Sequence, residues 1–289
     1  MTNSPEIFDR RALQQNRSRA SEYDRSHDFL FENVSHRLIE KLSMIKRSFS
    51  RVLDLGCRRG HTKTIIDPRH GRDSFINCDI SATMAGLADP PQLVANEELL
   101  PLADDCLDLV LSSLYLHWTN DLPQALAEIL RCLRPDGLFL GALLGGDTLS
   151  DLRTSLGTAV SPESSELFPR VAPFVQLRDL GDLMQRIGFT MIVVDVDQIT
   201  VDYPDPFSLM KDLRRMGEGN ALTARCRHFT PRELLTKAGN LYPKRGNEPT
   251  GRISAKFEVL YSVGWAPHPK QQQALRPGAG KRGLQEVLG

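Results

Sequence analysis

The chain has 289 residues, of which 40% are hydrophobic and 25% are charged, and its formal net charge is zero. These values are ordinary for a globular enzyme of one large domain, with ample chain to bury a core. No apolar run approaches the roughly 18 residues that span a bilayer, and the N-terminus lacks the apolar core of a signal peptide. We therefore expect a cytoplasmic protein.

Charge is distributed unevenly along the chain. Residues 51–224 carry 25 acidic and 15 basic side chains, whereas residues 225–289 carry 12 basic and 4 acidic ones. The basic end could contact an anionic partner or a membrane surface, or could be a solvated tail. No aromatic residues are interleaved with its basic ones, so nucleic-acid binding is not expected.

The cysteine and histidine patterns do not predict a metal site. The five cysteines are scattered without a C-x-x-C pair, which indicates reduced thiols rather than disulfides or bound zinc. None of the seven histidines forms the H-x-D/E pattern of a non-haem iron site. We therefore expect no bound metal.

The first half of the chain predicts strands that alternate with helices. Residues 1–26 are polar and rich in arginine, and they predict an arm that becomes ordered only against the domain. Apolar residues then recur at three- and four-residue steps from His27 to Ile45, as on one face of a helix. Short β-type runs predict strands at 51–56, 75–79, 92–95, 107–112 and 138–144, with helices at 61–66, after Ser81 and at 122–133. This order is typical of a parallel sheet with helices on both faces.

The second half is less regular. The breakers Arg134 to Gly137 predict a turn between helix and strand, and residues 161–175 predict a loop. Further helices are expected at 148–160, 177–187, 207–216 and 231–242, and further strands at 191–201 and 257–265. We divide the chain into an N-terminal arm and helix (1–50), a main domain (51–265) with a substrate-side insertion at about 148–250, and a disordered basic tail (266–289).

A glycine-rich loop follows the first predicted strand. Asp54 precedes Gly56, and Gly60 closes the loop. Glycines here let the backbone approach a nucleotide-like ligand, because no Cβ intervenes. The G-x-G-x-x-G spacing of a dinucleotide loop is absent, and Asp54 would repel a pyrophosphate. The same acid suits a ligand that carries an ammonium and a sulfonium.

Asp79 stands at the end of the second predicted strand, 25 residues after Asp54. A carboxylate at this place can accept both hydrogens of a ribose diol. The alternative is an ordinary acid in a surface turn. Its position directly after the apolar residues of the strand favours ribose binding.

These residues resemble the motifs of the class I S-adenosylmethionine-dependent methyltransferases. The acid and glycines of that family's first motif match Asp54, Gly56 and Gly60, its ribose acid matches Asp79, and its adenine-facing residue matches Asn96. A D-L-V strand and an L-R-P-D-G turn follow in the family's order. The resemblance implies a Rossmann-like α/β fold with a seven-stranded, mostly parallel sheet and S-adenosyl-L-methionine as cofactor.

A narrower resemblance covers nearly the whole chain. Segments 112–126, 141–153, 173–189, 194–221 and 261–268 are similar to complex I (NADH:ubiquinone oxidoreductase) assembly factor 5 and its bacterial relatives. Mitochondrial members are described as hydroxylating an arginine of a complex I subunit. The resemblance therefore implies a protein substrate and, in a eukaryote, the mitochondrial matrix, although the sequence does not reveal an oxidant for hydroxylation.

Two positions depart from the methyltransferase pattern. Arg58 replaces the middle glycine of the loop, and its side chain must either point to solvent or fill the methionine end of the cofactor site. Asn96 replaces an acid, but its amide oxygen can still accept from the adenine amine. The cofactor contacts expected from the resemblance are Asp54, Gly56, Cys57, Gly60, Asp79, Ile80, Asn96, Glu97 and Ser112.

Candidate catalytic residues follow the fourth and fifth strands, at the edge where open parallel sheets bind ligands. Tyr115, His117 and Trp118 could line the substrate mouth, or could simply cover the cleft and hydrogen-bond within a turn. Asp147 follows Gly145-Gly146 and could meet a cationic group such as a guanidinium, or could cap the next helix. We select Tyr115, His117 and Asp147 as the catalytic candidates.

The sequence leaves three functions open. The first is an S-adenosylmethionine-dependent enzyme that modifies a protein side chain during complex I assembly. The second is a carboxyl methyltransferase for a small molecule or a carrier-bound acid, because the malonyl-acyl-carrier-protein methyltransferases of biotin synthesis share the nucleotide motifs. The third is a non-catalytic assembly chaperone whose loop is altered by Arg58.

Overall fold

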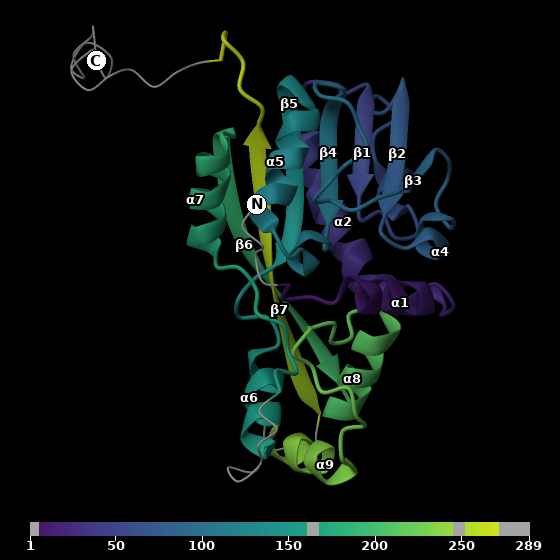
Figure 1. The fold of residues 1–289 in the computed structure, drawn as a ribbon, viewed down its shortest axis with the longest axis vertical. Helices are drawn as coiled ribbons and strands as arrows, with labels where there is room; N and C mark the ends of the chain where they lie inside the picture. The colour runs from purple at the N-terminus through teal and green to yellow at the C-terminus, as the bar shows by residue number, and fades with distance from the viewer. Residues whose placement is uncertain (1–5, 161–167, 245–251, 272–289) are drawn as a thin grey trace, which may run out of the picture.

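The computed structural model describes residues 6–160, 168–244 and 252–271. Their centre is one seven-stranded sheet with the order β3-β2-β1-β4-β5-β7-β6 (Figure 1). The strands are β1 (Arg51–Leu55), β2 (Ser74–Asp79), β3 (Gln92–Val94), β4 (Leu107–Ser113), β5 (Leu133–Leu144), β6 (Thr190–Tyr203) and β7 (Ile253–Trp265). Strand β7 is antiparallel to both of its neighbours, β5 and β6, and strands β1 to β5 pair in parallel with one another. The expected Rossmann-like, mostly parallel sheet is confirmed.

Helices cover both faces of this sheet, as the alternating pattern predicted. The helices are α1 (Arg10–Ala20), α2 (Phe29–Ser43), α3 (His61–Ile65), α4 (Ala82–Ala85), α5 (Leu122–Cys132), α6 (Ser150–Ala159), α7 (Leu177–Ile187), α8 (Pro206–Arg215) and α9 (Arg232–Leu241), with 3-10 turns η1 (Arg25–Asp28) and η2 (Leu116–Trp118). Ser81 caps α4 as expected, since its hydroxyl accepts from the Met84 amide. Gly188 ends α7 with a left-handed backbone, φ 112°.

Two hydrophobic clusters lie on opposite faces of the sheet because successive side chains of a strand point to opposite sides. Val52 of β1 packs in a cluster with α2, whereas its neighbour Leu53 packs in another with α5 and α7. In β4, Leu109 joins the first cluster and Val110 the second. The central strands are thus buried on both faces, as continuous apolar runs predict.

A second group of helices lies beyond the carboxyl end of the sheet. In Figure 1, α6, α8 and α9 surround the lower ends of β6 and β7. These two strands have 14 and 13 residues and pair from Thr190↔Trp265 to Tyr203↔Ile253. Within the segment expected as an insertion, β6 is a strand of the sheet and α7 packs against it, whereas α6, α8 and α9 form this second group.

The N-terminal arm contains a regular helix, α1, which lies crosswise between the sheet and the second group of helices (Figure 1). Asp9 caps it by accepting from the Ala12 amide. Leu13, Arg17 and Ala20 form its buried face. The residues expected only as an arm therefore place a helix over the carboxyl ends of the strands.

Arg134 to Gly137 were expected to form a turn that separates the helix from the next strand, and this expectation was wrong. Helix α5 does end at Cys132, but β5 begins at once with Leu133 paired to Leu107 of β4. A register shift next to this pair accommodates the breakers, and Asp136 takes a left-handed φ of 67°. The breakers therefore form a bulge between the paired residues Leu133 and Leu138.

The described residues hold neither a membrane-spanning helix nor a metal-binding cluster. None of their helices is both long and apolar enough to cross a bilayer. In the same part of the chain, no three His, Cys, Asp or Glu side chains are grouped to hold a metal ion. Residues 272–289 of the expected basic tail lie outside the described residues.

Candidate functional site

The glycine-rich loop joins β1 to α3 at the carboxyl edge of the sheet. Gly56, Arg58 and Gly60 all have positive φ, at 79°, 51° and 73°. The amides of Gly56 and Cys57 donate to the Cys78 carbonyl at 2.8 and 2.9 Å, which ties the loop to β2. The tight strand-to-helix turn predicted from the glycines is present.

Asp54 is a buried carboxyl group below this loop. Its side chain is 1% exposed, and neither of its oxygens has a hydrogen-bond partner of ordinary geometry among the described residues. Burial raises its pKa to about 7, with a smaller contribution from the Asp79 charge, against the opposing effect of the Thr62 hydroxyl. An orphaned buried acid is costly unless a donor or cation reaches it.

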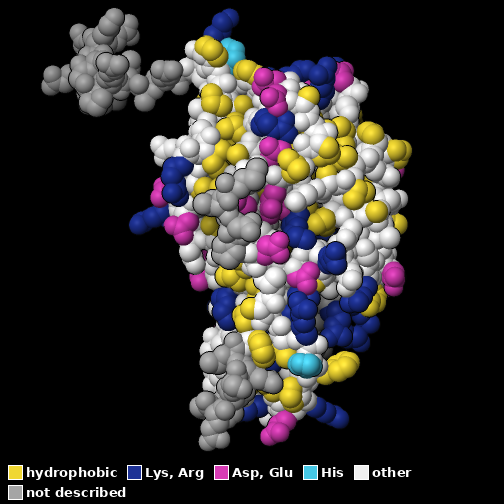
Figure 2. Space-filling view, in the orientation of Figure 1, with side chains coloured by type: hydrophobic (Ala, Val, Ile, Leu, Met, Phe, Trp, Pro, Cys, Tyr) yellow, Lys and Arg dark blue, Asp and Glu magenta, His cyan; other side chains and the backbone are white. Residues whose placement is uncertain are grey.

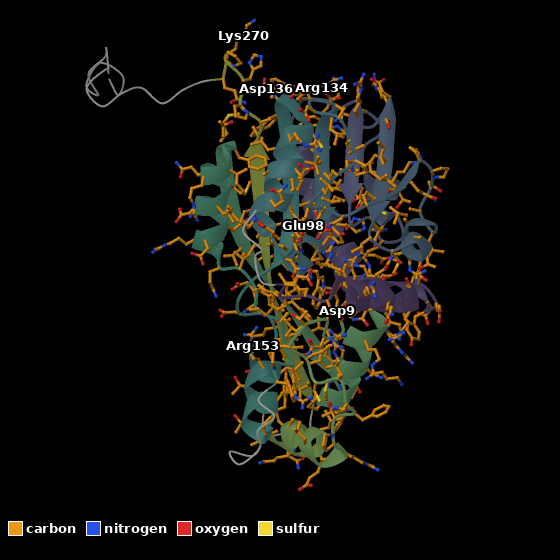
Figure 3. All side chains as sticks on the ribbon, viewed as in Figure 1. Asp9, Glu98, Arg134, Asp136, Arg153 and Lys270 are labelled. Carbon is orange, nitrogen blue, oxygen red and sulfur yellow. The ribbon has the colours of Figure 1, made fainter. Side chains whose placement is uncertain are left out.

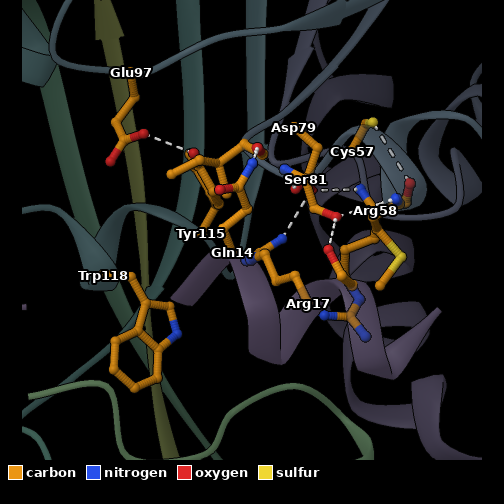
Figure 4. Close-up of polar contacts among 12 residues, drawn as sticks. Gln14, Arg17, Cys57, Arg58, Asp79, Ser81, Glu97, Tyr115 and Trp118 are labelled. Atoms are coloured by element: carbon orange, nitrogen blue, oxygen red, sulfur yellow. Dashed lines mark hydrogen bonds and ion pairs between the residues drawn. The ribbon is translucent and has the colours of Figure 1, made fainter. Parts of the chain in front are cut away.

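Asp79 ends β2 and is fully buried. Its Oδ1 accepts from the Ser81 amide at 2.9 Å, and its Oδ2 accepts from the Arg58 amide at 3.3 Å. The Arg17 Nη1 also donates to Oδ2, at 2.8 Å (Figure 4). Asp79 therefore lies beside the glycine-rich loop, where a ribose acid is expected, but a guanidinium from α1 already contacts it.

Arg17 is buried completely, an unusual position for a guanidinium. Its Cζ lies 4.7 Å from the centre of the Tyr115 ring. Its Nε and Nη2 have no hydrogen-bond partner among the described residues. The Asp79 charge raises its pKa, although burial opposes this, so the side chain stays cationic.

A second arginine of α1 meets the next strand end. Arg10 donates from Nη1 and Nη2 to the two oxygens of Glu97, both at 2.6 Å, and from Nη2 to Asn96 Oδ1 at 3.0 Å. Glu97 also accepts from the Tyr115 hydroxyl at 2.6 Å (Figure 4). It accepts from the Thr119 hydroxyl at 3.0 Å as well. Burial raises the pKa of Glu97, but the charge and hydrogen bonds of Arg10 more than offset this and lower it overall.

Arg58 points into the protein, so the expectation that it could swing out to solvent was wrong. Its Nη2 donates to Asp28 Oδ1 at 2.8 Å and to the Met216 carbonyl at 2.9 Å. Its Cζ lies 3.6 Å from the centre of the Phe31 ring. The side chain thus joins the loop to η1, α2 and the end of α8.

Tyr115 occupies the space directly in front of the loop. A Cβ added to Gly56 would lie 2.3 Å from the Cβ and Cγ of Tyr115, so only glycine fits at that position. His117 and Trp118, two and three residues on, both contact Glu218. The Trp118 Nε1 donates to Glu218 Oε2 at 2.6 Å, and the His117 Nε2 lies 3.2 Å from the same oxygen.

The remaining expected contacts are scattered around this edge. Ser112 is buried in β4, and its hydroxyl has no partner among the described residues. The Ile80 carbonyl accepts from Gln14 of α1 at 3.2 Å. Gly60 packs tightly, since a Cβ there would lie 2.7 Å from the Ala88 Cβ.

Asp147 lies apart from the other candidates. It is exposed, and Leu149 rather than Asp147 is the N-cap of α6. The loop that carries it is held by Arg153 of α6, which donates to the carbonyls of Gly146, Thr148 and Ala172 (Figure 3). The capping role considered for Asp147 is therefore wrong.

A large chamber opens between the sheet edge and the second group of helices, with a volume of about 760 Å³. His117, Trp118 and Glu218 lie in its wall, together with apolar side chains such as Leu114 and Phe174. Asp147 is not among the described residues that line it. The chamber is large enough for a substrate, and it adjoins the loop through Phe31 and Met216, which line it and contact Arg58.

Arg10, Arg17 and Glu218 were missed in the sequence. Arg10 and Arg17 are seven residues apart, which places them on the same face of a helix, and Asp9 is a typical N-cap residue. These signals could have revealed α1 and its two inward cations. Glu218 gave no local signal, since it follows α8 in an irregular segment.

Comparisons with known proteins agree with this geometry. A sequence profile described as a methyltransferase domain matches residues 53–141. Over 280 residues the chain is 36% identical to the mitochondrial arginine-hydroxylase NDUFAF5 of Homo sapiens, with 94% of this chain and 81% of that protein covered. The chain belongs to the NDUFAF5 family. It therefore has the fold and domain of an S-adenosylmethionine-dependent methyltransferase-type enzyme.

Other relatives of this NDUFAF5-family chain act on a different kind of substrate. The malonyl-[acyl-carrier protein] O-methyltransferase of Methylovorus is 31% identical over 284 residues, with 93% of each chain covered. In fold, the chain resembles the YcgJ protein of Bacillus subtilis, with a TM-score of 0.58, 16% identity, and coverage of 81% of this chain and 99% of the other.

Proposed function

We propose that the chain uses S-adenosylmethionine and modifies an arginine side chain of a complex I subunit, in the cytoplasm or, in a eukaryote, in the mitochondrial matrix. The observation that carries the proposal is the row of three acids beside the glycine-rich loop: Asp54 and Asp79 lie at the ends of β1 and β2, and Glu97 lies shortly after β3. Neighbouring parallel strands bring such groups to one edge, where a nucleoside can span them.

The residues present suit the parts of this cofactor. The two unpartnered oxygens of Asp54 can accept from its ammonium group, and the hydroxyl of Ser112 is also without a partner. Asp79 can accept from ribose hydroxyls once Arg17 withdraws, and Glu97 with Asn96 can meet the adenine amine. The sulfonium would supply an activated group, and the protein would align it and exclude water.

The substrate would enter through the chamber. Its wall brings His117 within hydrogen-bond reach of Glu218, so the imidazole can hold or pass on a proton beside the substrate. Tyr115 separates the chamber side from the glycine loop and is bonded to Glu97. Exposed Asp147 would contact the partner protein outside the chamber.

Two measurements test the proposal. We expect S-adenosylhomocysteine to raise the melting temperature of the purified protein, because a ligand that binds only the folded state stabilises it. We also expect mass spectrometry of complex I subunits to show an arginine modification that disappears when the gene is deleted. The added mass, of a methylene or of an oxygen, distinguishes methylation from hydroxylation. No thermal shift and no lost modification would contradict the proposal and favour a chaperone.

A second candidate is carboxyl methylation of a carrier-bound acid. Three exposed cations, Arg19, Lys211 and Arg214, lie at the chamber and would suit an anionic group. The malonyl-acyl-carrier-protein methyltransferase relatives support this reading. Incubation with malonyl-acyl-carrier protein and S-adenosylmethionine tests it, and a methyl ester on the malonyl group would establish it over arginine modification.

A further inference from the structure

Glu218 is a buried carboxylate on the chamber side of the site. It follows Gly217, whose φ of 82° turns the chain away from the end of α8. The Glu218 side chain is 7% exposed, and its Oε2 accepts from Trp118 and faces His117. Its Oε1 has no hydrogen-bond partner among the described residues. One strong acceptor is thus held rigidly without a donor.

The surroundings keep Glu218 ionised. Burial raises its pKa, but the hydrogen bond and charge of His117 and the nearby charges of Arg17 and Arg58 lower it overall. Leaving an ionised oxygen buried without a donor is costly, so a group that supplies a donor gains strongly from binding there.

Glu218 is the sole carboxylate among the described residues that line the chamber. Aromatic side chains lie next to it in the wall. The rings of Trp118 and Phe174 lie 5.6 and 5.7 Å from that of His117, centre to centre. Flat aromatic faces beside one unpartnered carboxylate oxygen suit a planar cation better than a compact, strongly hydrated ammonium.

We infer that Glu218 binds the guanidinium of the substrate arginine inside the chamber, with Oε1 accepting its N–H groups. This inference rests on the proposed function and assigns the residue that would select its substrate. A guanidinium offers five donors in one plane, so it can bond to Oε1 while its face packs against the aromatic wall.

The charges at the chamber also indicate which residues flank the substrate arginine in its own protein. Arg19, Lys211 and Arg214 are exposed among the lining residues, and no described side chain pairs with them. Figure 2 shows Lys and Arg side chains gathered on the lower half of the molecule, around the junction of α1 and α8. These cations would repel a free cation but attract carboxylates, so the target is an arginine flanked by acidic residues.

The experiment measures discrimination between arginine and citrulline, its uncharged near-isostere. The probes are two capped pentapeptides, one with arginine between aspartates and one with citrulline in its place. Calorimetry with the full-length wild-type protein, with and without S-adenosylhomocysteine, should show about tenfold or greater preference for the arginine peptide. A wild-type protein that binds both equally, or neither, would overturn the inference without any variant being needed.

Glu218→Gln then locates the selectivity. It keeps an oxygen for the Trp118 hydrogen bond but removes the charge, so the arginine preference should fall to about twofold or less. Glu233→Gln, an exposed acid on α9, is the matched control and should keep the full preference. Retained preference in folded Glu218→Gln would assign the guanidinium to another group.

The two proposals fail separately. If arginine preference depends on Glu218 but gene deletion removes no arginine modification, the guanidinium site at Glu218 is supported and the proposed reaction is contradicted. If deletion removes the modification while Glu218→Gln still selects arginine, the proposed reaction is supported and the role of Glu218 is contradicted.

Discussion

Arg17 of α1 donates to Asp79 at the tip of β2 across 2.8 Å, and both side chains are fully buried. The residue expected to bind ribose therefore already has a cationic partner supplied by the N-terminal helix. Arg10 stands in the same relation to Glu97 one strand further along. In this structure α1 closes the cleft, and a nucleoside would compete with its two arginines for the same carboxylates.

We predict that Arg17→Ala tightens S-adenosylhomocysteine binding by about fivefold, on the order of 1 kcal/mol, because the ligand no longer displaces a guanidinium from Asp79. The same change should destabilise the ligand-free protein by about 3 kcal/mol, since it leaves a buried carboxylate unpaired. Calorimetry and urea denaturation measure the two effects. Arg11→Ala, exposed on the same helix, is the control. Weaker binding by Arg17→Ala would mean that Arg17 itself contacts the cofactor.

Asp79→Ala should weaken S-adenosylhomocysteine binding by tenfold or more, about 1.4 kcal/mol or greater, because the ribose loses its acceptor. The variant also leaves Arg17 buried without its ion pair, so a loss of folding stability would add to the measured loss of affinity. We therefore compare Arg17→Ala with the double variant Arg17→Ala/Asp79→Ala by calorimetry. Equal affinities in that pair would remove Asp79 from the cofactor site.

Arg58→Gly should preserve or tighten cofactor binding, because it restores the usual glycine and the left-handed backbone at this position favours one. It also removes a charged hydrogen bond to Asp28 and the contact with Phe31, so unfolding should become easier by on the order of 2 kcal/mol. Thermal melts and calorimetry report the two effects independently. A clear loss of affinity in a folded variant would make Arg58 a ligand contact.

Stability should fall with rising pH through the titration of Asp54. Its folded pKa of about 7 lies above the ordinary 3.8, so the unfolded chain loses the proton first. The contribution of the neutral acid is therefore complete below about pH 4, declines between pH 4 and 7, and is gone above pH 7. The decline should reach a few kcal/mol at most, roughly 4. Urea denaturation of wild type and Asp54→Asn from pH 5 to 8 measures it, and parallel curves would contradict it.

Local sequence predicted the elements that bring the acids together. Apolar runs located β1 and β2, and glycines marked the turn after β1, so Asp54 and Asp79 could be placed at one edge of a sheet. This works because strand ends in a parallel sheet are neighbours whatever the intervening loops do.

Contacts between distant segments could not be read in this way. Arg17 meets Asp79 across 62 residues of chain, and Trp118 meets Glu218 across 100. Neither pair follows from periodicity, because each depends on how α1 and the end of α8 pack on the sheet. The start of β5 differed for a related reason: Leu133 and Leu138 both pair with β4, so the breakers between them form a bulge within the strand.

The long ladder between β6 and β7 constrains how this molecule could open. Both strands continue from the sheet into the group formed by α6, α8 and α9, and their hydrogen bonds run along nearly their whole length (Figure 1). A long two-stranded ladder of this kind resists bending. The distance between the second group of helices and the carboxyl edge of the sheet should therefore stay fixed. Movement that admits a cofactor is then left to the short N-terminal helix, which is held by side chains such as Arg10 and Arg17 and by one short backbone pairing at Phe8.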